Sequence, residues 1–456
     1  MYRGLVEPCI PIQSGVGGPI PVPGRTNSFR SGARVVRVGR IRGKSVQSQP
    51  SGETLLTFSP YRLLTEPERM HQELRMGPPV RYVQEESGFS YWLITRYAEA
   101  RQALLARGLS NDPRLLDHRV DAHHAYSPMA NNDPPDHTRL RKLVSPCFTR
   151  RRIAALEPRA EQVVGELLDA VAPDGRADVI SDLAFPLPVL LICELLGVPT
   201  EDRVSFGVWA ARMLSVASDR PRTGVERSRR LRAYFSRLIE AKRAAVPSGA
   251  TAEEQPDLLC ALIAAQRESG SLSDEELVGL AVLILVAGHE TTSNLIGNGL
   301  LTLFLSPGQL ALLRADMSIL PSAVEELLRF EGSAGQSSLR VAVDDVEIGG
   351  TRIPRGSVVN IGLSLANRDP AVFTGSDALD LRRKPNPHLA FGHGTHFCLG
   401  APLARMLAEK ALGALLSRFP SLALAADPGD LEWRQISILC GLTGLLVSFD
   451  PEKGGT

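Results

Sequence analysis

Apolar residues are spaced as in a buried helix along one stretch that runs from 273 to about 306. The run from Leu277 to Ala287 is almost entirely apolar, and Ser273 and Glu276 precede it in the positions of a capping box. At a rise of about 1.5 Å per residue, such a helix would be roughly 50 Å long. It is therefore predicted to cross the interior of the fold.

Helical periodicity also dominates the rest of the chain. Helices are predicted over 66–75, 96–106, most of 151–245, and 401–418. Breaks are predicted at 173–175, 197–199 and 219–224, and a polar linker at 247–255. Alternating residues predict a hairpin from 82–84 and 91–95, and an antiparallel meander over 341–361 with turns at 344–345, 349–350 and 354–356. The predicted fold class is mainly α with a small β-region.

Two further helix starts are predicted from capping signals. Asp136 follows two prolines and is expected to be the N-cap of a helix that carries His137 and Arg141 four residues apart on one face. On a surface helix, these two residues would be a solvated pair.

The second start is at Ser322, which forms a potential capping box with Glu325. The helix that follows would carry Glu326 and Arg329 on the same side. Taken by themselves, these two residues could form an exposed ion pair that contributes little to stability.

The first 52 residues differ in composition from the remainder. They are rich in Gly, Ser, Pro and Arg, and carry eight basic residues against the single acid Glu7. Without sustained periodicity, residues 1–52 are predicted to be a disordered extension. Residues 53–456 are predicted to form one globular domain.

Composition narrows the class of protein. A formal net charge of +1 over 456 residues argues against a general nucleic-acid binder. Six unevenly spaced cysteines do not resemble a secreted disulfide framework. No apolar run reaches about 18 residues, and no apolar segment follows the early basic residue, so neither a membrane span nor a signal peptide is predicted. We expect a cytoplasmic monomer.

One cysteine, Cys398, occupies a distinctive position. It stands in a glycine-rich loop just before the helix predicted to begin at Ala401. Backbone N–H groups and the positive end of that helix are expected to face the sulfur and lower the pKa of its thiol. Glycines at three positions would permit tight turns and the close approach of a large flat ligand: Gly392, Gly394 and Gly400.

The remaining cysteines are interpreted as inert buried residues: Cys9, Cys147, Cys193, Cys260 and Cys440. A zinc site formed by His393, His396 and Cys398 is an alternative interpretation of the loop. The sequence lacks the repeated spacing of structural zinc motifs, so this alternative is not favoured.

The middle of the long apolar helix carries polar residues at Ala287-Gly288-His289-Glu290-Thr291-Thr292. An acid and two hydroxyls are costly there unless they are satisfied or used. In one interpretation, Thr291 bonds back to a preceding carbonyl and the helix bends locally. In the other, these polar groups are used in the chemistry of the protein.

Two motifs together resemble a known family. The pattern Phe391-Gly392-x-Gly394-x-His396-x-Cys398-x-Gly400, continued by Leu403-Ala404-Arg405, matches the signature of the cytochrome P450 haem-thiolate monooxygenases. The segment Ala287 to Thr291 is similar to the small-Gly-x-acid-Thr pattern of the same family, which implies that Gly288 leaves a groove for dioxygen and that Glu290 and Thr291 organise water and relay protons. The resemblance covers about residues 55–450 and implies the cytochrome P450 fold with a single haem domain.

The resemblance implies roles for particular residues. Cys398 would be the axial thiolate ligand of haem b (iron protoporphyrin IX), which activates O2, and Glu290 and Thr291 would be catalytic. The haem propionates and pocket would be contacted by His137, Arg141, Arg340, His388, His396, Ala287, Gly288, Phe391 and Gly392. A buried structural set would consist of Glu326, Arg329 and Arg383, with Arg382 as the alternative third member.

The substrate pocket is less clearly marked. The segment 332–338 is small and polar and would edge it, a helical pair joined by the loop at 219–224 would form a lid, and residues 436–442 would return to line it. Candidate pocket residues are Ala334, Gln336, Ser337, Leu283 and Ile438. A roomy site of this kind favours a bulky small molecule such as a polyketide, terpenoid or peptide, delivered free or on a carrier protein.

The expected reaction is insertion of one oxygen atom from O2 into an organic substrate, as in hydroxylation or epoxidation. The sequence stops soon after the cysteine helix, so electrons from NAD(P)H are expected to arrive through a ferredoxin or flavodoxin with its reductase. Arginines that could dock an acidic carrier are Arg139, Arg150, Arg151 and Arg405. Two alternatives remain open: peroxide-driven, coupling, dehydration or nitration chemistry on the same cofactor, and a non-enzymatic haem sensor.

Overall fold

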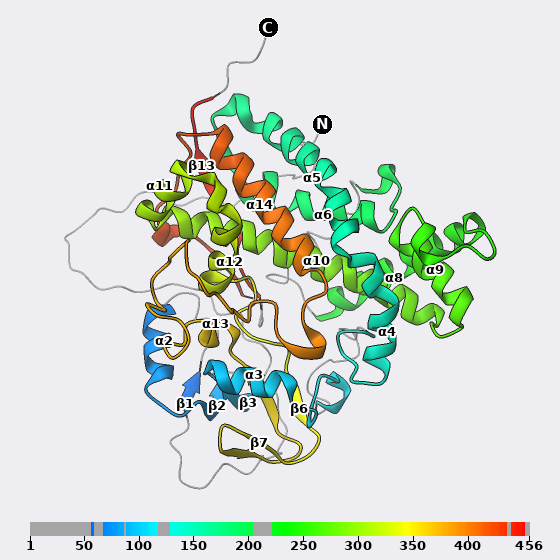
Figure 1. Cartoon of the computed structure of the whole chain (residues 1–456), viewed down its shortest axis with the longest axis horizontal. Helices are drawn as coiled ribbons and strands as arrows, with labels where there is room; N and C mark the ends of the chain where they lie inside the picture. The colour runs from blue at the N-terminus through cyan, green and yellow to red at the C-terminus, as the bar shows by residue number, and fades with distance from the viewer. Residues whose placement is uncertain are drawn as a thin grey trace, which may run out of the picture. The chain divides into compact units, whose positions relative to one another are not determined.

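A long helix, α10 (Asp274–Phe304), crosses the helical part of the protein (Figure 1). The computed structural model describes residues 56–58, 67–85, 88–116, 128–203, 221–435 and 439–451, all within the unit 47–456. Ser273 caps α10, and the capping box with Glu276 is present in both directions, as predicted. By length and composition α10 could span a membrane, but 67% of its most apolar window is buried inside the fold. We interpret it as a core helix.

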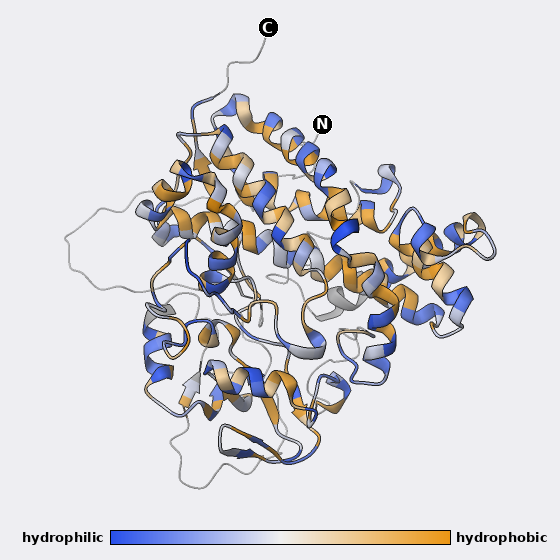
Figure 2. Ribbon diagram, viewed as in Figure 1, coloured by the Kyte–Doolittle hydropathy of each residue, from blue (hydrophilic) through white to orange (hydrophobic). Residues whose placement is uncertain are grey.

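The helices around α10 supply most of the hydrophobic core. Leucine-rich faces of α10 pack against α6 (Pro186–Leu195), α12 (Leu320–Glu331), α14 (Ala401–Arg418) and α8 (Pro221–Ala245). Figure 2 shows hydrophobic residues along α10 and mixed faces on α5 and α14. Each buried leucine contributes about 2 kcal/mol relative to an exposed one, so this packing outweighs local propensities. The other main helices of this part are α5 (Arg150–Val171), α9 (Leu258–Ser269) and α11 (Pro307–Ala315).

A six-stranded sheet stands beside the helical part. Its strand order is β1-β2-β3-β9-β6-β4, with parallel pairs at β1–β2 and β3–β9. The strands are β1 (Leu56–Phe58), β2 (Val80–Glu85), β3 (Ser90–Ile94), β4 (Leu109–Ser110), β6 (Arg340–Ala342) and β9 (Val358–Ile361). The predicted hairpin is present as β2–β3. Helices α2 (Pro67–Arg75), α3 (Tyr97–Leu105) and α13 (Leu363–Ala366) accompany this sheet.

The predicted meander over 341–361 is wrong in its connections. Its outer strands, β6 and β9, pair with each other and belong to the large sheet. Its inner strands, β7 (Val346–Ile348) and β8 (Thr351–Ile353), form a separate hairpin. Alternation places strands correctly but cannot choose their partners, because pairing depends on which sheet edge is available. The remaining strands form the sheet β10-β13-β5, from Ala423–Leu424, Leu446–Ser448 and Arg176–Asp178, and the pair β11–β12, from Trp433–Gln435 and Cys440–Leu442.

Several predicted helix boundaries need correction. Asp136 is the first residue of α4 (Asp136–Val144) and not its cap; Pro135 occupies the cap position, and Asp136 instead pairs with Arg139. Ser322 lies inside α12, which begins at Leu320, so the predicted capping box at Ser322 is wrong. The predicted loop at 219–224 ends early, because α8 begins at Pro221. The predictions for residues 1–52, for the part of the lid that falls within 204–220 and for Ile438 lie outside the described residues.

Candidate active site

The loop that carries Cys398 leads directly into α14 (Figure 1). Gly392 and Gly394 have φ angles of 71° and 77°, which other residues adopt only with strain. The Cys398 N–H donates to the Phe391 carbonyl at 2.9 Å, which closes the loop. A short 3₁₀ turn, η7 (Gly394–His396), precedes the cysteine and contacts α3. Gly400 has an ordinary φ of −81° and open space beside it, so its freedom of turning is not needed.

The Cys398 thiol is accessible to solvent, yet enough protein surrounds it for desolvation to raise its pKa. Hydrogen bonds from the Gly400 and Ala401 N–H groups, and the charges of Arg141 and Arg405, act in the opposite direction. The predicted N–H groups are therefore present, but the predicted lowering of the pKa is wrong for the protein alone, since desolvation outweighs them. Among the described cysteines, Cys147, Cys193 and Cys260 are buried, Cys440 is partly accessible and Cys398 is the most exposed.

Four basic residues gather beside this loop. The rings of His137, on α4, and His396, in η7, lie with their centroids 4.1 Å apart. Burial lowers the pKa of both, and that of His396 falls to about 4. Arg340, at the start of β6, and Arg141 add positive charge that further disfavours protonation of His396.

Three buried nitrogen atoms of this cluster have no hydrogen-bond partner within the described protein: His137 Nδ1, His396 Nε2 and Arg340 Nε. Such groups are costly unless a ligand satisfies them. Arg340 remains cationic, because burial lowers its pKa only to about 10. The cluster therefore fits an anionic ligand with carboxylate or phosphate oxygens, such as the two propionates of a haem.

His388 does not belong to this cluster. Its Nε2 lies 3.1 Å from a carboxylate oxygen of Glu325, and its Nδ1 accepts from the Ala390 N–H at 3.2 Å. Both ring nitrogens are therefore occupied within the protein. The prediction that His388 binds a propionate is corrected accordingly.

The centre of α10 has a short accessible face within an otherwise buried helix. Ala287 is exposed, and Leu283 and Thr291 are partly exposed at the spacing of successive turns. The Thr291 hydroxyl donates to the Ala287 carbonyl at 2.8 Å, as in the local interpretation above. Its oxygen retains acceptor capacity, so this bond is compatible with a role in handling water. Glu290 is 4% exposed and therefore nearly inaccessible to bulk solvent.

Gly288 also has a packing role that the sequence did not indicate. A Cβ atom at this position would lie 2.6 Å from Cδ1 of Ile192 on α6. The missing side chain therefore permits the close approach of α6 and α10; the groove for dioxygen stays a prediction. Gly288 is partly exposed, and so is Thr291, while Ala287 is exposed.

The buried set around Glu326 is fully connected. Glu326 and Arg329 are 0% and 1% exposed, and the pair makes two hydrogen bonds of 2.7 and 2.8 Å. Arg383 Nε lies 3.1 Å from both carboxylate oxygens of Glu326, whereas Arg382 lies near Asp316. Asn386 also donates to Glu326, which ties the chain leading to the cysteine loop to α12.

The polar segment after α12 uses much of its hydrogen bonding internally. The Gln336 amide oxygen accepts from Asn360 at 2.7 Å, and the Ser337 hydroxyl donates to the Ser338 carbonyl. Ala334 forms an isolated β-bridge with Leu439, so the segment does meet the β12 end of the tail. Gln336 is only 5% exposed, and its buried Nε2 has no hydrogen-bond partner within the described protein, so Gln336 stays a candidate pocket residue.

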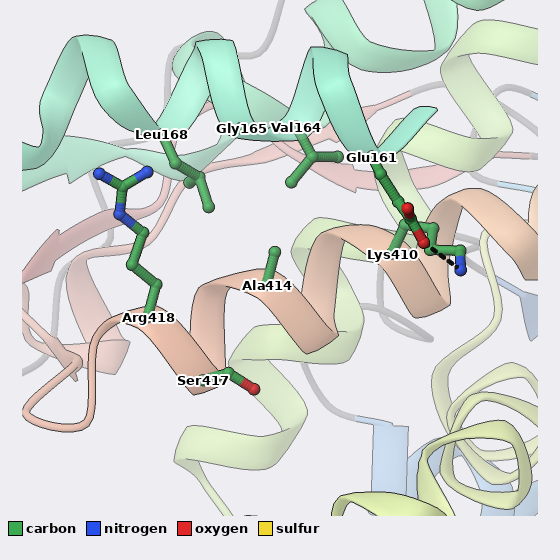
Figure 3. Close-up of a pocket in the computed structure, with 8 residues that line it drawn as sticks. All are labelled: Glu161, Val164, Gly165, Leu168, Lys410, Ala414, Ser417 and Arg418. Atoms are coloured by element: carbon green, nitrogen blue, oxygen red, sulfur yellow. Dashed lines mark hydrogen bonds and ion pairs between the residues drawn. The ribbon is translucent and has the colours of Figure 1, made fainter. Parts of the chain in front are cut away.

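Neither a metal-binding cluster nor the groove between α5 and α14 contributes to the candidate site. Within the described residues, no group of three His, Cys, Asp or Glu side chains is arranged to hold a metal ion, so the zinc alternative finds no support. An open groove of about 390 Å³ lies between α5 and α14 and is lined by Val164, Leu168, Ala414 and the Glu161–Lys410 ion pair (Figure 3). None of the candidate site residues lines this groove.

Two of the four arginines suggested for docking an acidic carrier are held in ion pairs within the protein. Arg139 binds Glu276 and Asp136, and Arg405 binds Glu325 through two hydrogen bonds. Arg150 and Arg151 are exposed. The Glu325–Arg405 pair was missed by sequence reasoning, because Glu325 was interpreted only as part of a capping box.

Comparison with known proteins gives consistent similarities. The family model described as Cytochrome P450 matches residues 213–430. The chain is 44% identical over 390 residues to the cytochrome P450 monooxygenase PikC of Streptomyces venezuelae, covering 84% of this chain and 91% of that protein. It is 41% identical to the 6-deoxyerythronolide B hydroxylase of Saccharopolyspora erythraea, covering 84% and 96%. Among solved structures, P450BioI in complex with an acyl carrier protein ligated to hexadec-9Z-enoic acid is similar, with a TM-score of 0.77, 34% identity, and coverage of 85% and 100%.

Proposed function

This chain belongs to the cytochrome P450 family and is a haem-dependent monooxygenase, and we propose that it oxidises a bulky secondary metabolite with Cys398 as the ligand of the haem iron. The observation that carries the assignment of the site is the cluster of basic residues beside an accessible cysteine. An accessible thiol at a helix start, with unpartnered His137, His396 and Arg340 nitrogens next to it, suits one iron and two propionates.

The residues around Cys398 would hold the cofactor in a fixed orientation. Cys398 would ligate the iron, and Arg141, Arg340, His137 and His396 would bind the propionates. Gly392 and Gly394 adopt the positive φ angles that the turns of the loop require, and the N–H groups of Gly400 and Ala401 hydrogen-bond to the sulfur and moderate its donation. When bound, haem supplies the activation of O2; the protein supplies binding, orientation and protons.

Proton handling is assigned to the accessible turn of α10. The Thr291 hydroxyl donates its hydrogen to the Ala287 carbonyl, so its oxygen can still accept a hydrogen bond on this face. Glu290, nearly buried, would exchange protons with water and pass them toward Thr291. Ala287 has only a methyl group, which leaves the face open to a small ligand.

The substrate class rests on the relatives and on the composition of the pocket strip. A relative at 41% identity is named for hydroxylation of 6-deoxyerythronolide B, and one similar structure holds an acyl chain on a carrier protein. Ala334 and Ser337 are small, and Leu283 is apolar and partly exposed on the accessible face of α10. These features favour a large, mostly apolar natural product, such as a polyketide, terpenoid or peptide, free or carrier-bound.

Electrons are proposed to come from NAD(P)H through a ferredoxin or flavodoxin and its reductase. Exposed Arg150 and Arg151 could attract an acidic carrier, whereas Arg139 and Arg405 are held in ion pairs. We further propose a cytoplasmic location, which agrees with the free thiols of the described cysteines.

The test is the absorption spectrum of the purified protein, reduced and exposed to carbon monoxide. A strongly red-shifted Soret band is expected for the wild-type protein and should be lost in Cys398→Ala. The matched control is Cys440→Ser, which alters another partly accessible cysteine and should retain the band. A wild-type spectrum typical of histidine or thiol ligation would contradict the assignment.

A further inference from the structure

A single carboxylate on α12 holds both ends of the loop that contains Cys398. Glu325 Oε1 accepts from Arg405 Nε at 2.6 Å, and Oε2 accepts from Arg405 Nη2 at 2.9 Å. The same Oε2 lies 3.1 Å from His388 Nε2. His388 stands before the loop and Arg405 lies in the first part of α14, so the segment between them is fastened at two points.

The two residues that Glu325 binds, Arg405 and His388, each also contact a residue of the loop. The Arg405 guanidinium carbon lies 4.6 Å from the centre of the Phe391 ring, and the Phe391 carbonyl accepts the Cys398 N–H. On the other side, His388 Nδ1 accepts from the Ala390 N–H at 3.2 Å. A displacement of Glu325 would therefore be transmitted to the residues on which the cysteine backbone depends.

The same arrangement controls a charge near the sulfur. The Arg405 guanidinium lies over the ring of Phe391, whose carbonyl accepts the Cys398 N–H, and Glu325 partly neutralises the charge of that guanidinium. Glu325 is ionised at neutral pH: burial raises the pKa of its carboxyl, but hydrogen bonds from His388 and Arg405 outweigh this and hold it at about 2. Glu325 and Arg405 are each 31% exposed, so solvent weakens their interaction without removing it.

We propose that Glu325 is a positioning residue for the Cys398 thiolate, which fixes the loop at both ends and sets how much of the Arg405 charge reaches the sulfur. This role rests on the proposed ligation of haem iron by Cys398. It is separate from that of the adjacent Glu326, which binds Arg329, Arg383 and Asn386 in the buried set.

The proposal makes a prediction about the sign of two changes. Glu325→Gln leaves the Arg405 charge unneutralised, which favours the more negative, reduced state of the iron–thiolate pair. Its reduction potential should shift to a more positive value. Arg405→Gln removes the charge and should shift the potential in the opposite direction. The expected size is up to a roughly tenfold change in the ferrous-to-ferric ratio at a fixed potential, equal to about 59 mV for one electron.

The experiment is a spectroelectrochemical titration of the purified haem-loaded protein and of four variants. Glu325→Gln and Arg405→Gln test the charge, and Glu325→Asp keeps the charge with a shorter reach. Glu161→Gln is the control. Glu161 lies on α5 and forms an exposed ion pair with Lys410, which is on α14 like Arg405, so the variant removes a carboxylate from a different ion pair of that helix. Conversion of the reduced carbon monoxide complex from its thiolate form to its thiol form is followed in parallel.

Opposite shifts in Glu325→Gln and Arg405→Gln, with no shift in Glu161→Gln, would support the proposal. Glu325→Asp should keep a potential close to wild type but lose the thiolate form several-fold faster, because the loop is held less firmly. Shifts of the same sign in both charge variants, or none, would overturn it. If Glu325→Gln does not retain haem, an unchanged potential in Arg405→Gln would overturn it equally.

The premise is tested by the wild-type protein in the same series. If its carbon monoxide complex lacks the thiolate band, the assignment of Cys398 is wrong and this inference falls with it. If the band is present and the two charge variants do not differ from the control, only the role of Glu325 is rejected.

Discussion

The hydroxyl of Ser333 donates a hydrogen bond of 2.6 Å to the main-chain carbonyl of Thr291. Thr291 lies on α10, and Ser333 follows the end of α12. The bond therefore joins the accessible turn of α10 to the segment 332–338. The same segment contacts the C-terminal part of the chain through the β-bridge between Ala334 and Leu439. It is one of the contacts by which segments distant in sequence are brought together at the site.

Ser333→Ala should lower the free energy of unfolding by about 1 kcal/mol, because a nearly buried hydrogen bond is lost. Urea denaturation of the two proteins measures this difference. Ser338→Ala is the control, since the exposed Ser338 hydroxyl is 3.4 Å from its partner on Asn111 and should change stability by less than about 0.5 kcal/mol. Equal losses in both variants would argue against a specific link to Thr291.

Thr291→Ala should uncouple oxygen consumption from product formation, because the accessible hydroxyl assigned to proton handling is removed. We expect product per O2 consumed to fall roughly tenfold or more, within the range of a general acid–base contribution. The measurement compares oxygen uptake with product by chromatography.

Thr292→Ala is the matched control for this change. The Thr292 hydroxyl donates to the Gly288 carbonyl at 2.8 Å, the same geometry as Thr291 with Ala287, but Thr292 is only 3% exposed. Its loss should leave coupling nearly unchanged. Unchanged turnover in Thr291→Ala would instead favour peroxide-driven or coupling chemistry.

Gly288→Ala should destabilise the protein, because the added methyl group would press against Ile192 at 2.6 Å. Overpacking of this kind costs about 1–3 kcal/mol, which exceeds the gain of about 1 kcal/mol in helix propensity. Thermal unfolding of the variant checks the sign.

Gly165→Ala on α5 is the matched substitution, since nothing lies within 4 Å of the added atom. It should be neutral or stabilising by about 0.5–1 kcal/mol. Stabilisation in both variants would show that α6 and α10 are not closely packed at Gly288.

The buried His71 should make stability depend on pH. Burial, and then the charges of Arg368 and Arg75, lower its pKa to about 3. Between pH 3 and its unfolded value of about 6.5, the unfolded chain binds more protons than the folded one, so the free energy of unfolding rises with pH. The contribution is complete above about pH 6.5 and is lost as the pH falls toward 3.

Urea denaturation between pH 4 and 8 of the wild-type protein and His71→Leu tests this dependence. The variant should show a smaller slope below pH 6.5, and its stability at pH 7 should change little, because His71 Nδ1 has no hydrogen-bond partner within the described protein. Identical slopes in the two proteins would show that His71 does not control the loss of stability.

Local patterns in the sequence were enough to locate α10 and its capping box, the start of α14 at Ala401, and the hairpin β2–β3. These features depend on neighbouring residues, since a capping box needs only four positions and a buried helix shows its own periodicity. The spacing around Cys398 was likewise sufficient to indicate the family and its cofactor, because the motif is contiguous.

Contacts between distant segments decided the remainder. Only the folded chain shows that Arg383 contacts Glu326, that Gly288 faces Ile192, and that β6 pairs with β9. The sequence by itself determined which residues are candidates for binding haem and for handling oxygen and protons. Tertiary structure alone decided that His388 turns to Glu325 while His137 and His396 keep unpartnered nitrogens, because a side chain's role depends on which polar groups the fold places within hydrogen-bond reach.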